Sequence, residues 1–410
     1  MSILEKFEGF LKSEQVDVRR KAVTTLGEIK SEKGVEYLLS TLNDSDHIVR
    51  STAIFSLGEI SSEGSVEALL PFLQEKDANI RSCTAVALGK IGSLKAEDAL
   101  IRALKDPDAY VRGCVASALA KIGSEKSEKL LVKILKTAEE PDARRKAIVA
   151  LKEVHTDRVR QAVFEALDDQ DETVRNCAAV AVGEIGIEEA EDKLIALLKK
   201  EPPDTQISML FALGEIRSEK AVLSIIPFLR SSHRDVAQQA ASALGKIRSD
   251  KALQELITLL SEKRSGMTWS VVEALGDTRR EEAVAPLTRF IQDSDPDVRW
   301  SVARGLGLIP SKTSLPPLLK MLNDPDVNVR SIAAVSLGHL GFDEAIDPLI
   351  AALKDSENKV IDSVAVALTE IGSPQVREKL QRLLPKLDNS LKETVRHILE
   401  EIQARFTTTV

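Results

Sequence analysis

The chain has 410 residues, more than one hydrophobic core usually organises, so either several domains or a repeat array is expected. Hydrophobic residues make up 43% of the chain and aromatic residues only 3%, so its core must be built from Leu, Ile, Val and Ala. The formal net charge of -8 argues against a nucleic-acid-binding protein, which needs a basic face to displace counterions from phosphates.

The three cysteines and the absence of long apolar stretches bear on the compartment. No Cys-x-x-Cys spacing occurs, which argues against a disulfide framework and favours a reducing environment. Residues 1–7 contain no basic region followed by an apolar run, and no later stretch approaches 18 uncharged apolar residues. We therefore expect no signal peptide, no membrane association and a cytoplasmic protein.

A period of 31 residues runs along the chain and is marked by an arginine that follows Val or Ile. In chain order this position, here called the ladder position, holds Arg19, Arg50, Arg81, Arg112, Arg144, Arg175, Gln206, Ala237, Thr268, Arg299, Arg330, Ile361 and Lys392. The fifth unit comes one residue late, which places a one-residue insertion in a loop around residues 137–141. The sequence thus contains thirteen units.

Each unit contains two helical patterns. The first has apolar residues spaced i, i+1, i+4, such as Leu38, Leu39 and Leu42, which form one stripe on a helix. A polar turn follows, and its Asp is a natural N-cap for a second helix, for example Asp46 before residues 49–60. The sequence predicts an all-α protein with about 26 helices in one domain over residues 1–404, followed by a short tail over residues 405–410.

The pattern resembles the HEAT repeat in its short form of about thirty residues, and it looks most like the HEAT-like repeats of phycobilisome (bilin) lyases and their relatives. The resemblance implies a right-handed α-solenoid whose second helices line a concave face. It also implies that the arginines form an internal ladder with acidic groups and carbonyls of neighbouring repeats. The acidic residue four positions before the arginine recurs and is the expected partner, as in Asp46, Asp77, Asp108, Asp171, Asp295 and Asp326. A glycine inside many second helices is expected to let the neighbouring helix approach closely.

Cysteine and histidine positions give little support to metal binding or catalysis. Cys83, Cys114 and Cys177 share one repeat position, where other units have Ser or Thr, so we expect them to be reduced and largely buried. The five histidines form no metal-ligand spacing, and none is followed by Glu, unlike the ligand motifs of deoxyhypusine hydroxylase, an iron enzyme built of similar repeats. No phosphate-binding loop or nucleophile motif occurs. We expect no cofactor, no metal and no catalytic residue.

A candidate partner site lies in repeats seven to ten, where three consecutive units lack the ladder arginine. The variable position directly after the ladder holds Ile207, Trp269 and Trp300, and the variable position four residues further on holds Phe211, Glu273 and Arg304. Tryptophan and arginine are enriched among binding hot spots. The alternative is that the tryptophans fill gaps left by the missing arginines. The missing arginines also predict a flexible waist between residues 206 and 268.

Three functions fit these features. The first is a non-catalytic scaffold or adaptor that binds another protein on the concave face. The second, implied by the family resemblance, is a bilin lyase or chromophore chaperone, with a bilin or a phycobiliprotein subunit as its partner. The third is a nucleic-acid repair enzyme, which the acidic charge opposes.

Overall fold

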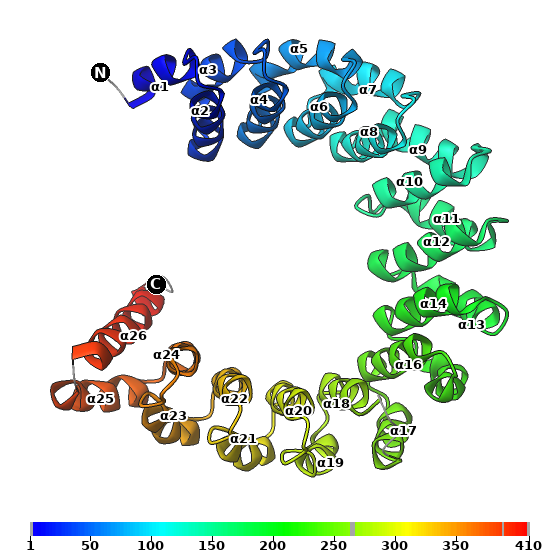
Figure 1. Cartoon of the computed structure of the whole chain (residues 1–410). Helices are drawn as coiled ribbons and strands as arrows, with labels where there is room; N and C mark the ends of the chain where they lie inside the picture. Colours follow the sequence, from blue (N-terminus) through cyan, green and yellow to red (C-terminus); the bar gives the residue numbers. More distant parts are fainter. Residues whose placement is uncertain (1–2, 263–266, 388, 408–410) are drawn as a thin grey trace. The chain divides into compact units, whose positions relative to one another are not determined.

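The computed structural model describes residues 3–262, 267–387 and 389–407. Over these residues the chain forms 26 α-helices with short 3-10 segments and no strand, which confirms the all-α prediction and its thirteen helix pairs. The chain divides into two compact units, Met1–Ala190 and Glu191–Val410. In each unit the second helices of successive repeats form one row and the first helices form another (Figure 1).

In unit 1 the first helices are α1 (Ile3–Leu11), α3 (Val35–Ser40), α5 (Val66–Leu69), α7 (Glu97–Ala103), α9 (Glu125–Thr137) and α11 (Asp157–Glu165). Its second helices are α2 (Val16–Ile29), α4 (His47–Ile60), α6 (Ala78–Ile91), α8 (Ala109–Ile122), α10 (Pro141–Leu151) and α12 (Glu172–Ile185). Short 3-10 segments are η1 (Glu32–Gly34), η2 (Glu63–Ser65), η3 (Leu70–Gln74), η4 (Leu94–Ala96), η5 (Ala166–Asp168) and η6 (Glu188–Ala190).

In unit 2 the first helices are α13 (Glu191–Leu198), α15 (Val222–Ile225), α17 (Asp250–Ser261), α19 (Val284–Thr288), α21 (Leu315–Met321), α23 (Ile346–Ala352) and α25 (Pro374–Leu383). Its second helices are α14 (Pro203–Glu215), α16 (Arg234–Ile247), α18 (Thr268–Asp277), α20 (Pro296–Leu308), α22 (Val327–Leu340), α24 (Asn358–Ile371) and α26 (Asn389–Thr407). Its 3-10 segments are η7 (Glu219–Ala221), η8 (Ile226–Arg230), η9 (Glu281–Ala283), η10 (Lys312–Ser314), η11 (Asp343–Ala345) and η12 (Leu384–Lys386).

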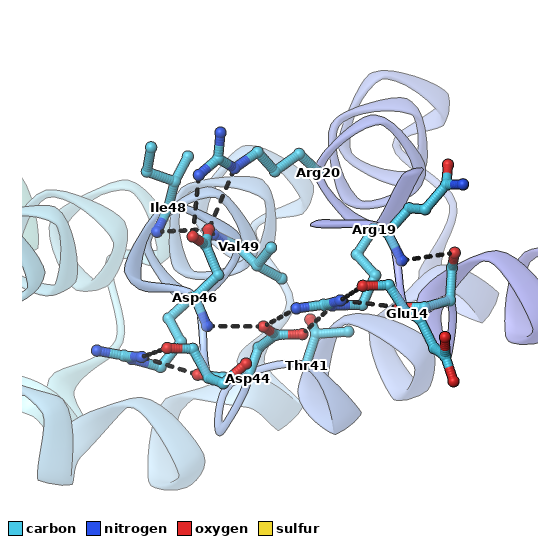
Figure 2. A network of polar contacts seen from close by, with 12 residues as sticks. Glu14, Arg19, Arg20, Thr41, Asp44, Asp46, Ile48 and Val49 are labelled. Atoms are coloured by element: carbon cyan, nitrogen blue, oxygen red, sulfur yellow. Dashed lines mark hydrogen bonds and ion pairs between the residues drawn. The ribbon is translucent and has the colours of Figure 1, made fainter. Parts of the chain in front are cut away.

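The aspartate of the polar turn caps the second helix, as the sequence predicts. The Asp46 carboxylate accepts hydrogen bonds from the backbone N–H groups of Ile48 and Val49, at 3.1 and 3.0 Å (Figure 2). Equivalent caps are formed by Asp77, Asp108, Asp171, Asp295 and Asp326. Each cap satisfies backbone donors that the first turn of a helix leaves without partners, so each turn fixes where the next second helix begins.

Five ladder arginines join neighbouring repeats through an acidic partner that is not the predicted one, whereas Arg50 and Arg112 donate to backbone carbonyls of their own turn and form no such bidentate pair within the described part of the chain. Arg19 donates from Nε and Nη2 to the two carboxylate oxygens of Asp44, at 2.7 and 2.9 Å, and from Nη1 to the carbonyl of Ser13 (Figure 2). The partner therefore lies 25 residues after the arginine, in the turn of the next repeat. The same bidentate pair recurs as Arg81–Asp106, Arg144–Asp169, Arg299–Asp324 and Arg330–Asp355.

The capping role explains this correction. The carboxylate of Asp46 already accepts from the N–H groups of its own helix, and both of its oxygens also accept from Arg20, which is not a ladder arginine. Asp44, two residues earlier, faces the preceding repeat and also accepts from the backbone N–H of Asp46. One turn thus supplies one aspartate to the helix cap and another to the inter-repeat pair.

The glycines inside the second helices lie where neighbouring helices touch, as predicted. A Cβ on Gly58 would stand 2.7 Å from Cα of Ala87, and one on Gly89 would stand 2.7 Å from Cα of Ala118. In unit 2 the same approach occurs between Gly338 and Ala367, at 2.6 Å. These distances are shorter than any real Cβ contact, so a larger residue would force the helices apart.

The cysteines are free but less buried than the sequence predicts. Cys83, Cys114 and Cys177 are all partly exposed. The structure shows that a small residue is tolerated here without full burial, because the equivalent Thr52 is also partly exposed while Ser301 is fully buried. Partial burial raises the pKa of each thiol above its ordinary value.

Candidate functional site

A groove of about 320 Å³ lies on the second-helix row of unit 2. Its lining residues come from three successive second helices: Ile207 of α14; Asp235, Gln238, Gln239 and Ser242 of α16; and Trp269, Ser270, Glu273, Ala274 and Asp277 of α18. All of them lie within unit 2, in the three repeats that lack the ladder arginine.

Helical spacing explains why these side chains meet. Trp269, Glu273 and Asp277 are four residues apart on α18 and therefore share one face of that helix. The opposite stripe of α18 is buried, as Val271 and Leu275 show. The neighbouring helix α16 contributes Asp235, Gln238, Gln239 and Ser242, which are spaced by three or four residues and so also share one helix face. The groove therefore lies between the polar faces of α16 and α18.

Four of the six predicted site residues lie in or beside this groove. Ile207, Trp269 and Glu273 line it, and Arg304 of α20 donates from Nη1 to Glu273 at 3.1 Å. Trp269 keeps 44% of its surface exposed. A ring that filled a gap left by a missing arginine would be buried, so the exposure of Trp269 argues against the gap-filling alternative for this residue.

Phe211 and Trp300 do not line the groove. The Lys246 ammonium lies 5.2 Å from the centre of the Phe211 ring and also contacts Glu215. The same combination of Lys, Phe and Glu recurs in unit 1, where the Lys90 ammonium lies 4.5 Å from the centre of the Phe55 ring and contacts Glu59. The Phe211 contact is therefore part of how neighbouring repeats pack. Trp300, on α20, is partly buried.

The groove is acidic. Three carboxylates line it, from Asp235, Glu273 and Asp277, and no lysine or arginine lines it. Glu273 is paired with Arg304, whereas the carboxylates of Asp235 and Asp277 form no ion pair within the described part of the chain. Burial raises the pKa of Glu273, against the lowering effect of Arg304.

Several polar groups in the groove lack partners. The Ser270 hydroxyl is inaccessible to solvent, in a residue only 6% exposed, and has no hydrogen-bond partner among the described residues. Across residues 3–262, 267–387 and 389–407 the amides of Gln238 and Gln239 also form no side-chain hydrogen bond. The hydroxyl of Ser301, at the equivalent repeat position on α20, is also shielded from solvent and without a partner among the described residues, so this feature belongs to repeat packing and does not mark the groove.

Sequence reasoning missed Asp235, Gln239, Ser270 and Asp277. Asp277 could have been found, because it lies two helical turns after Trp269 on the same face. Asp235 and Gln239 come from the neighbouring helix, and only the packing of α16 against α18 brings them beside the tryptophan.

The described residues hold no group of three or more His, Cys, Asp and Glu side chains that could bind a metal ion. No helix in the described part is both long and apolar enough to cross a membrane. The chemistry available in the groove is therefore that of carboxylates, amides, a hydroxyl and an indole ring.

Stacked helix pairs that repeat every 31 residues define the protein as an α-solenoid. The family model of HEAT repeats matches residues 4–87, 66–151, 128–205, 191–268, 266–327 and 315–400, so the chain belongs to the HEAT-repeat family. No curated protein matches the sequence significantly.

Two solved structures, of Kap95p and of importin beta, have a similar fold. Kap95p, in a structure concerning its binding to RanGDP, is 14% identical, with a TM-score of 0.56 over 98% of this chain and 66% of that chain. Importin beta is 15% identical, with a TM-score of 0.50 over 98% of this chain and 61% of that chain. The chain thus spans about two thirds or less of the length of these two proteins.

The complex of CpcE and CpcF of phycocyanin lyase from Nostoc sp. PCC7120 is 22% identical over 59% of this chain and 94% of that chain, with a TM-score of 0.39. At their identities of 14% and 15%, the likenesses to Kap95p and importin beta show the fold alone. HEAT-repeat solenoids are typical of protein-interaction scaffolds.

Proposed function

We propose that this protein is a non-catalytic scaffold that binds a partner protein on the second-helix row of unit 2, with the groove beside Trp269 at the centre of the contact. The observation that carries the proposal is the exposure of Trp269 next to a groove in which the carboxylates of Asp235 and Asp277 form no ion pair within the described residues. An exposed indole ring that becomes covered on binding contributes a large contact area and is the residue type most enriched among hot spots.

The predicted residues take different roles in this proposal. Ile207 and Trp269 supply apolar contact, Glu273 supplies charge, and Arg304 holds Glu273 in place through its ion pair. Phe211 and Trp300 lie outside the groove and would contribute at the edge of a larger contact. Kap95p, whose fold is similar, binds a protein partner, which supports a protein as the kind of partner here.

The groove does not favour the alternative of a bilin lyase or chromophore chaperone. A bilin carries anionic propionate groups, which the carboxylates of Asp235 and Asp277 would repel. Trp269 is also the single aromatic side chain that lines the groove.

Site-specific crosslinking tests the proposal. A photoreactive residue at Gln238, inside the groove, should capture a partner protein in native lysate, and Trp269→Ala in the same chain should abolish that product. Asp362 provides the matched control, because it occupies the same repeat position on α24 and is exposed. Identical products from positions 238 and 362, or a product that survives Trp269→Ala, would contradict the proposal.

A further inference from the structure

We propose that the partner inserts a basic side chain, arginine in preference to lysine, into the groove between Trp269 and the carboxylates of Asp235 and Asp277. This inference rests on the proposed function, since it names the chemistry of the partner segment that the same groove recognises. The occupant is a short peptide segment of another protein that presents one cationic side chain.

Charge complementarity is the first argument. The groove is lined by three carboxylates and by no basic side chain, and only Glu273 is neutralised by an ion pair. A further cation beside α18, Arg248, uses its Nε to donate to the backbone carbonyl of Asp277 at 2.9 Å. A cation in the groove would therefore meet two carboxylates that have no competing ion pair among the described residues.

The aromatic ring is the second argument. Trp269 is the only aromatic side chain lining the groove, and it shares a helix face with Glu273 and Asp277. An indole face attracts a cation through its quadrupole, and tryptophan is the strongest side chain in this respect. A planar guanidinium can stack on the ring and at the same time donate to a carboxylate, which an ammonium cannot do as well.

The unpartnered acceptors are the third argument, and they are independent of charge. The amide oxygens of Gln238 and Gln239 on α16 line the groove, and neither side chain forms a hydrogen bond among the described residues. A guanidinium carries five N–H donors and no acceptor, so unused amide oxygens beside the carboxylates suit arginine.

The size of the groove sets how much of the partner it takes. A volume of about 320 Å³ is at the lower end of small-molecule sites, so it accommodates one side chain and not a folded domain. Ile207, at the α14 side of the groove, offers an apolar surface for the aliphatic part of a long basic side chain.

Fluorescence titration of the full chain tests the inference with three defined probes. Acetyl-Gly-Arg-Gly-amide, its lysine analogue and its neutral citrulline analogue are titrated into the Trp300→Phe variant, in which Trp269 is the only tryptophan. We expect a saturable change with the arginine peptide, weaker binding of the lysine peptide and at least tenfold weaker binding of the citrulline peptide. Citrulline is the matched probe because it keeps the planar shape of arginine without its charge.

Variants then locate the contact. Asp277→Asn should weaken binding of the arginine peptide about two- to fivefold, the effect of one partly exposed charge pair, and Asp362→Asn on α24 should leave binding unchanged. Equal binding of arginine and citrulline peptides, or an Asp277→Asn variant that binds as well as the parent, would overturn the inference. A partner crosslinked at Gln238 together with either of those results would leave the proposed function standing while cation recognition fails. Peptide binding without a crosslinked partner would instead support cation recognition while the proposed function fails.

Discussion

Replacing Gly89 by Ala tests how the repeats pack. Gly89 lies on α6, and a Cβ there would stand 2.7 Å from Cα and 2.9 Å from Cβ of Ala118 on α8. Carbon atoms in contact rest at about 3.5–4.0 Å, so the two helices would have to separate by about 1 Å. Alanine gains about 1 kcal/mol in helix propensity, but overpacking of a close contact costs about 1–3 kcal/mol. Because the atom that blocks the new methyl group belongs to the backbone and not to a flexible side chain, we expect the upper end of that cost. The free energy of unfolding of Gly89→Ala should therefore be about 2 kcal/mol lower than that of the parent protein.

Gly113 provides the matched control within the same unit. It lies on α8, and the nearest atoms to a Cβ there belong to the flexible side chain of Lys146, at 3.5 Å or more. Gly113→Ala should therefore stabilise the protein by up to about 1 kcal/mol. Urea denaturation followed by circular dichroism, with hydrogen exchange of the α6 and α8 amides, measures both variants. A Gly89→Ala variant as stable as Gly113→Ala would refute the packing argument.

Three further predictions concern the waist, acid stability and chromophores. Second-helix amides over residues 206–268 should exchange faster than those over residues 50–112, because the first range has no ladder arginine while the second has the bidentate Arg81–Asp106 pair. Equal protection would rule out a flexible waist. The hydrogen bond from Arg20 lowers the pKa of Asp46 to about 2, so this carboxylate stabilises the fold above about pH 4 and loses that effect as the pH falls through about 2. Asp46→Asn keeps a capping side chain, so in urea denaturation it should be less stable than the parent at pH 6 and equally stable near pH 2. The same difference in stability at both pH values would show that the charge of Asp46 does not stabilise the fold. Addition of a bilin should leave its absorbance spectrum unchanged, and a shifted, saturable absorbance band would favour the lyase alternative instead.

The fold could be predicted from the sequence because its signal is repeated thirteen times. Caps such as Asp46 and helix ends such as Gly92 follow from local rules that need no knowledge of the neighbouring repeat. The partner of each ladder arginine could not be predicted in the same way. Two aspartates, Asp44 and Asp46, stand in one turn, and only the packing of repeats decides which of them reaches Arg19.

The residues of the groove that lie on one helix could be predicted from the sequence, whereas those brought in by the packing of a second helix could not. Trp269 and Glu273 stand out because they are unusual residues at variable positions of one helix. The acidic character of the groove depends on Asp235, which belongs to another helix and looks like an ordinary first-turn residue in the sequence. Phe211 was selected because it is aromatic, and its twin Phe55 shows that an aromatic residue at this position can serve repeat packing alone.

The affinity of the crosslinked partner for the Trp269→Ala variant tests the central proposal most directly. Calorimetric titration of the full chain with that partner should show binding at least tenfold weaker for Trp269→Ala than for the parent, with helix content unchanged by circular dichroism. Asp362→Ala, at the same repeat position on α24, should leave the affinity as it was. Unchanged affinity in the Trp269→Ala variant would contradict a contact centred on the groove, and loss of helix content in that variant would show the ring to be part of the core.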